Sequence, residues 1–160
     1  MSVVSLTSRA HRGSRPLAQR RRAFHIRVNR DSSARPSPSR ARRTKADATL
    51  PPFSGAVLAG NTLYLAGEIG TDANNKVPDT AEAEAKAVLD KIQARLKSAG
   101  MSMDDLVSVQ IFCSDVKHYD AFNGVYRTYF KKELPARAFI GAGTLLFNAR
   151  FEVQGIAVKR

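Results

Sequence analysis

Cysteine, histidine and long apolar runs are scarce in this 160-residue sequence, and each scarcity excludes a class of function. The single cysteine, Cys113, cannot form an internal disulfide, which agrees with a reducing compartment. It stands in an apolar run, so we interpret it as a buried thiol rather than a nucleophile. Three scattered histidines, His11, His25 and His118, do not suggest a metal site or a Ser-His-acid triad. No apolar run approaches the length of a membrane span, so we expect no membrane partner.

Acidic residues are nearly absent from the first 46 positions, where 13 basic side chains accompany only Asp31. This segment therefore carries the entire formal net charge of +12, and residues 47–160 are neutral, with 13 basic and 13 acidic groups. A neutral domain lacks the basic surface that phosphate binding requires, so we expect no nucleic-acid partner.

The composition of residues 1–46, rich in Arg and Ser and poor in acidic residues, predicts a disordered organelle transit peptide. Arg22-Ala23-Phe24 resembles a mitochondrial processing site, which favours the mitochondrion, with the plastid as the alternative. A retained, disordered basic arm is the other interpretation of the same composition. The chain is thus divided into a basic segment, 1–46, and one domain, 47–160.

The domain is long enough for a single compact core, and its apolar periodicity predicts five strands and two helices. The predicted strands are 56–59, 62–66, 106–113, 137–141 and 149–158. The predicted helices begin with Asp79 as N-cap and end at Gly100, and begin near Asp115 or Asp120 and end at Phe130. The order ββαβαββ predicts an α+β domain in which both helices cover one face of a mixed sheet. Self-association would bury the other face. Gly67, after the second strand, marks either a β-bulge or a close backbone approach to a ligand.

Arg137 and Glu152 are the most informative charges, and we place them on neighbouring strands of a largely apolar region. A buried guanidinium or carboxylate is costly there unless it is paired or functional. Arginine binds a carboxylate through two parallel hydrogen bonds, and a nearby glutamate can orient or deprotonate water. The pair therefore suggests a site for a small carboxylic acid. A structural ion pair, or two side chains that point into solvent, explains the same pattern.

Several segments of residues 51–160 together resemble the Rid (YjgF) family of reactive-intermediate deaminases. The matching segments are 52–57, 60–67, 109–112 with Asp115, 122–126, 129–130, Pro135-Ala136-Arg137 and 151–157. The resemblance implies a chorismate-mutase-like fold and a homotrimer with three clefts between subunits. It also implies hydrolysis of 2-aminoacrylate-like enamines or imines to 2-keto acids and ammonia, without cofactor or metal.

The same resemblance assigns roles to individual residues. Arg137 would hold the substrate carboxylate, Glu152 would activate or position water, and Asn123 would lie near the pocket. Four residues depart from the family pattern: Phe53 replaces a tyrosine, Ala66 a serine, Glu68 a glutamine and Phe139 a cysteine. We therefore expect a drier and reshaped pocket. Its expected substrate contacts are Phe53, Ala66, Gly67, Asn123 and Phe139.

These observations predict an imine deaminase with Arg137 and Glu152 as catalytic residues and a small imino or keto acid as its ligand. The lost pocket hydroxyls and thiol motivate a second hypothesis. In it the chain is a trimeric small-carboxylate-binding or partner-regulating protein with little catalysis. The two hypotheses differ in whether Glu152 faces the cleft beside Arg137 or pairs away from it.

Overall fold

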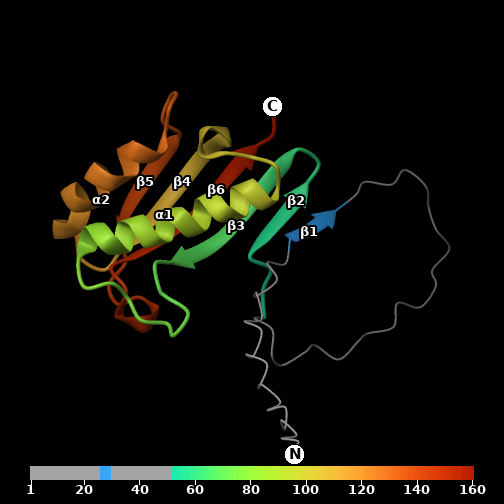
Figure 1. The fold of residues 1–160 in the computed structure, drawn as a ribbon. Coiled ribbons are helices and arrows are strands. Elements are labelled where there is room, and N and C mark those ends of the chain that lie inside the picture. Colours follow the sequence, from blue (N-terminus) through green and yellow to red (C-terminus); the bar gives the residue numbers. More distant parts are fainter. Residues whose placement is uncertain (1–25, 30–51) are drawn as a thin grey trace, which may run out of the picture.

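The computed structural model describes residues 52–160 and the backbone of residues 26–29, and Figure 1 shows their arrangement. The strands are β1 (Ile26–Asn29), β2 (Ala56–Ala59), β3 (Thr62–Ile69), β4 (Leu106–Cys113), β5 (Ala136–Gly141) and β6 (Phe151–Val158). The helices are α1 (Ala81–Ser98) and α2 (Tyr119–Tyr126). Short 3-10 turns lie at Met103–Asp105, Val116–His118, Arg127–Tyr129 and Leu146–Asn148.

The six strands form one mixed sheet in the order β1-β2-β3-β6-β4-β5. The pairs β1/β2 and β4/β5 are parallel, and the other neighbours are antiparallel. Both helices lie over the same face of the sheet (Figure 1). The predicted α+β architecture is therefore confirmed. The strand order also corrects one expectation: β4 lies between β5 and β6, so Arg137 and Glu152 are not on neighbouring strands.

One strand lies where the sequence predicts disorder. β1 pairs in parallel with β2, with Ile26 opposite Ala56 and Asn29 opposite Ala59. These four residues are the only part of segment 1–46 that the structure describes, so the transit-peptide interpretation of that segment stays a prediction. The pairing covers the β2 edge, which would otherwise present unpaired backbone N–H and C=O groups. The rest of that segment, including Arg22-Ala23-Phe24, lies outside the described residues.

Helix α1 supplies one side of the core and has a different N-cap from the predicted one. The Oγ1 of Thr80, not Asp79, accepts a hydrogen bond from the backbone N–H of Ala83 at 3.2 Å. The C-terminal end agrees with expectation, because Gly100 follows the C-cap with a φ of +72°, a conformation that favours glycine. The buried residues of α1 recur at helical spacing: Ala81, Glu84, Ala85, Val88, Leu89, Ile92 and Leu96.

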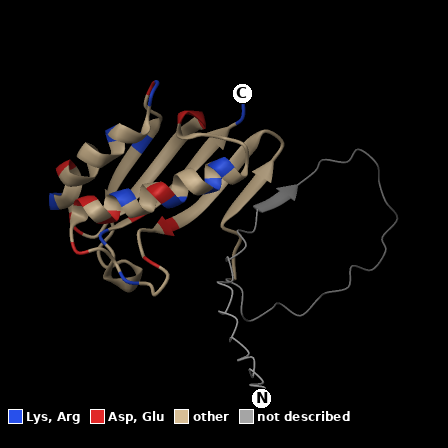
Figure 2. Cartoon of the chain, in the orientation of Figure 1, with Lys and Arg blue, Asp and Glu red and all other residues tan. Residues whose placement is uncertain are grey.

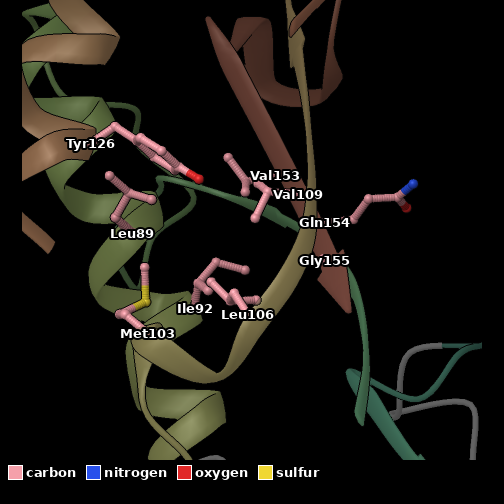
Figure 3. Close-up of a pocket in the computed structure, with 9 residues that line it drawn as sticks. All are labelled: Leu89, Ile92, Met103, Leu106, Val109, Tyr126, Val153, Gln154 and Gly155. Carbon is pink, nitrogen blue, oxygen red and sulfur yellow. The ribbon is translucent and has the colours of Figure 1, made fainter. Parts of the chain in front are cut away.

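Aromatic residues of α2 complete the core, as their spacing predicts. Phe122 and Tyr126 are fully buried, whereas Tyr119 is 45% exposed. The phenol of Tyr126 points from α2 into a narrow apolar cavity between α1 and the sheet (Figure 3). This cavity has no room for a water molecule, and the Tyr126 hydroxyl has no hydrogen-bond partner among the described residues. Burial raises the pKa of Tyr126 to about 12, so the phenol stays neutral at physiological pH.

A buried carboxylate joins α1 to the beginning of β6. Glu84 is fully buried, and its Oε1 accepts hydrogen bonds from the backbone N–H groups of Arg150 (2.6 Å) and Phe151 (2.9 Å). Its Oε2 accepts from Arg150 Nη1 at 2.8 Å. The guanidinium of Arg150 also donates to the carbonyls of Pro78 and Asp79. These bonds hold the strand that carries Glu152 in a defined position relative to α1.

The sheet face opposite the helices is only partly covered and carries few charges. Tyr64 and Ile140 on this face are 49% and 38% exposed. Figure 2 shows Lys, Arg, Asp and Glu mainly on the helices and loops. Within residues 26–29 and 52–160, no helix is long and apolar enough to cross a membrane. The same residues contain no group of three or more His, Cys, Asp or Glu that could hold a metal ion.

Candidate active site

Arg137 lies on β5 with its side chain on the helix-covered face of the sheet. The β4/β5 register pairs it with Val109, which belongs to the core on that face. Its Nη1 donates a hydrogen bond to Asn123 Oδ1 on α2 at 2.7 Å. Its guanidinium carbon also lies 4.9 Å from the ring centroid of Tyr126 and 5.7 Å from that of Tyr119. Neutral groups on α2 therefore orient this cation.

The guanidinium borders a pocket of about 160 Å³ at the edge of the sheet. The pocket is lined by Asn123, Tyr126, Arg127, Leu134, Pro135 and Arg137. Among the described residues, no carboxylate forms an ion pair with Arg137. A half-buried arginine that is fixed by neutral partners and open to a pocket can bind an anion, and its planar fork suits a carboxylate.

Glu152 lies on the other face of the sheet. It pairs with Phe112 of β4 and Ile69 of β3, and its neighbours Phe151 and Val153 point into the core. Because successive side chains of a strand alternate between faces, Glu152 points away from the helices. It is half-buried and has no cationic partner in the described part of the chain. Within one subunit, the sheet thus separates Glu152 from Arg137.

The carboxylate of Glu152 rests against Gly67. The β3/β6 register shifts between Leu65 and Glu68, so Gly67 lies in an irregularity of the sheet. A β-bulge at Gly67 was one of the two interpretations of its sequence position. A Cβ on Gly67 would lie 2.9 Å from Glu152 Cδ and even closer to one carboxylate oxygen. The missing side chain at this position therefore creates the space that the carboxylate occupies.

The other predicted contacts divide between these two places. Phe139 lies beside Arg137, whose guanidinium carbon is 5.9 Å from its ring centroid, and its ring packs edge-on against Tyr119 and Phe122. Ala66 precedes Gly67 in the irregularity, and Phe53 is 61% exposed before β2. The pocket lining includes Arg137 and Asn123 but none of Phe53, Ala66, Gly67, Phe139 and Glu152.

Sequence reasoning did not assign Tyr126 to the site. The aromatic spacing of α2 indicated a core residue, and Tyr126 is indeed buried. It also lies three residues after Asn123, and residues at this spacing are neighbours on a helix surface. That spacing was the available signal that a ring would stand next to any ligand of Asn123.

The chain is similar to known proteins in sequence and in fold. The family model described as Endoribonuclease L-PSP matches residues 44–159. The solved structure of the YjgF gene product of E. coli is 27% identical, with a TM-score of 0.65, and the match covers 68% of this chain and 89% of that one. RidA from Psychrobacter is 28% identical, with a TM-score of 0.66 over 72% of this chain and 94% of that one. The chain belongs to the Rid (YjgF) family.

Curated relatives of this Rid-family chain include enzymes. The mouse protein named 2-iminobutanoate/2-iminopropanoate deaminase is 35% identical over 118 residues, which are 72% of this chain and 87% of the relative. The human protein of the same name is 32% identical over 117 residues. Imine hydrolysis breaks a C–N bond. These relatives therefore indicate that this Rid-family chain is an enzyme that acts on C–N bonds.

Proposed function

We propose that this protein hydrolyses 2-imino acids to 2-keto acids and ammonia, and that 2-aminoacrylate-like enamines enter as their imine tautomers. The observation that carries the proposal is the guanidinium of Arg137, which borders a pocket without a carboxylate partner among the described residues. Relatives named 2-iminobutanoate/2-iminopropanoate deaminase support the choice of substrate class. RNA is disfavoured despite the name of the family model, because residues 47–160 carry balanced charge.

The proposed site requires more than one subunit. Arg137 and Glu152 carry opposite charges, lie on opposite faces of one sheet and have no charged partner among the described residues. A homotrimer would bury the open sheet face and would bring Glu152 of one subunit toward Arg137 of the next. Such a cleft between subunits is a common place for a small-molecule site.

In this mechanism, Arg137 binds the substrate carboxylate and so fixes the adjacent imine carbon. Glu152 takes a proton from water while the water oxygen bonds to that carbon, and it passes this proton to the imine nitrogen, which returns Glu152 to its carboxylate form. The hydroxyl proton of the resulting carbinolamine then moves to its amino nitrogen, the C–N bond breaks, ammonia leaves and the ketone forms, so that one imine and one water give one keto acid and one ammonia. Placement of water and imine supplies most of the rate gain, because the site has few chemical groups.

The first experiment uses the purified full chain with an amino acid oxidase, which generates imino acids in the presence of semicarbazide. We expect the protein to lower semicarbazone formation, because it hydrolyses the imine before the trap reacts. Several amino acids would then report the preferred side chain. If a folded protein lowers no semicarbazone but still binds 2-keto acids, the small-carboxylate-binding hypothesis replaces this one.

Gly67→Ala tests the place assigned to Glu152. The new Cβ would displace the carboxylate, and we expect kcat to fall by about ten- to hundredfold, because a shift of about 1 Å in a reacting group can cost that much. The free energy of unfolding should change little, since the displaced atoms are the far end of a flexible side chain. Gly124→Ala on α2 is the matched control, because no atom lies within 4 Å of its Cβ position. Equal kcat for Gly67→Ala and Gly124→Ala would contradict the assignment.

A further inference from the structure

The backbone under Glu152 is not held by the regular sheet ladder. Between Leu65 and Glu68 the β3/β6 pairing is interrupted, so Ala66 and Gly67 have no register partner in β6. The N–H of Ala66 instead donates to the carbonyl of Gly55 at 3.1 Å. Contacts from outside the ladder must therefore fix the surface on which the Glu152 carboxylate rests.

Two cations of α1 supply these contacts. Arg95 forms an ion pair with Glu68, the residue after Gly67. Lys91, one turn earlier, donates to the carbonyl of Ile69 at 2.7 Å and to Thr71 Oγ1 at 3.1 Å. Because residues four apart lie on the same side of a helix, both cations reach the same end of β3.

Arg95 also touches the segment that precedes β2. A Cβ on Gly55 would lie 2.7 Å from Arg95 Cζ, so the guanidinium occupies the space above this glycine. Arg95 therefore contacts both Gly55 and Glu68, and the Ala66–Gly55 hydrogen bond joins the same two segments. The side chain of Arg95 thus contacts both the segment before β2 and the part of β3 that follows Gly67.

The ion pair is well shielded from solvent. The side chains of Arg95 and Glu68 are 15% and 10% exposed. Burial raises the pKa of the Glu68 carboxyl, Arg95 and Lys91 act in the opposite direction, and the nearby Glu152 raises it further. Loss of Arg95 would leave Glu68 without its ion-pair partner beside the bulge.

We propose that Arg95 and Glu68 are positioning residues for Glu152, which hold the Gly67 backbone and thereby set the place of the Glu152 carboxylate. Neither side chain lines the pocket at Arg137. They act through the backbone of β3, so they influence the step that uses Glu152 and leave carboxylate binding at Arg137 unchanged. This inference rests on the proposed imine hydrolysis.

The test compares Arg95→Met, Glu68→Gln and the double variant in the full-length protein, with steady-state kinetics and denaturant unfolding. We expect each single variant to lose about tenfold or more in kcat, with KM within about twofold of wild type, because positioning of a reacting group is impaired while binding is not. Arg95→Lys keeps the charge and should restore part of kcat. Lys97→Met, which removes an exposed cation two residues away, is the matched control and should match wild type.

The double variant separates positioning from stability. Removing both charges should recover unfolding free energy relative to the single variants, since no unpaired buried charge remains, whereas kcat should stay low. Recovery of both quantities would show a purely structural role and overturn the inference. So would a single variant with normal kcat, or one whose loss lies only in KM. An inactive wild-type protein would instead overturn the proposed function, and this inference with it.

Discussion

Replacement of Arg137 by alanine should lower kcat/KM for imino acids by about two to three orders of magnitude. Among the described residues, Arg137 is the only cation in the pocket that a hydrogen bond holds in place. Its Nη1 donates to Asn123 Oδ1 at 2.7 Å. Loss of a charge-assisted contact to a substrate carboxylate costs about 2–5 kcal/mol, and each 1.4 kcal/mol corresponds to a factor of ten. The measurement is steady-state hydrolysis with the semicarbazide trap, together with titration of a 2-keto acid.

Arg137→Lys tells a charge effect from a geometric one. Lysine keeps the positive charge but lacks the planar fork that binds both carboxylate oxygens, so we expect an intermediate loss, mainly in KM. Lys132→Ala removes an exposed cation shortly before β5 and serves as the control. The circular dichroism spectrum and the mass of the assembly in solution must match wild type for all three variants. Near-normal hydrolysis by a folded Arg137→Ala protein would rule out the mechanism.

The elements of the fold were predictable because their signals are local. Apolar residues in α1 recur at helical spacing, and the eight-residue strands β4 and β6 are rich in apolar and β-branched residues, so each could be assigned from its own sequence. The layer arrangement followed from the order of these elements. The N-cap was misassigned by one residue, since Asp79 and Thr80 are both good caps and only the hydrogen bond to Ala83 decides between them.

The geometry of the candidate site was less predictable, because it depends on strand order and register. Consecutive strands are often neighbours, so β5 and β6 were expected to pair. Instead β6 pairs with β3 and β4, and β5 is the edge strand beyond β4. Register then places Arg137 opposite Val109 and Glu152 opposite Phe112, on alternate faces. No local pattern in either strand contains this information.

Long-range polar contacts were also invisible in the sequence. Glu84 and Arg150 are 66 residues apart, and Glu68 and Arg95 are joined only once α1 packs over β3. Charges on an amphipathic helix are normally solvated, so the sequence around Arg95 does not indicate a buried ion pair. Glu84 was the one residue of α1 whose charge conflicts with its place among the apolar core positions. A glutamate there needs hydrogen-bond or ion-pair partners.

Glu84→Ala should be the most destabilising of these substitutions, with a loss of about 3–5 kcal/mol in the free energy of unfolding. It removes the partner of a buried ion pair and leaves the backbone N–H groups of Arg150 and Phe151 without their acceptor. The side chain of Arg150 is 27% exposed, so water can solvate part of its charge, and the loss should lie near the lower end. Denaturant unfolding at one fixed protein concentration is the measurement, since self-association would add to stability.

Two further variants, Glu84→Gln and Lys86→Ala, test whether the loss of stability expected for Glu84→Ala comes from its buried charge. Glutamine keeps the shape and one acceptor oxygen but not the charge, so its loss should be smaller than that of alanine. Lys86 forms an exposed pair with Asp90 on the same helix, with side chains 65% and 49% exposed, and its removal should cost less than about 0.5 kcal/mol. If Glu84→Ala and Lys86→Ala unfold at the same denaturant concentration, the buried carboxylate does not join α1 to β6 as the structure indicates. A large difference would show that the strand carrying Glu152 is held to α1 from its first residue.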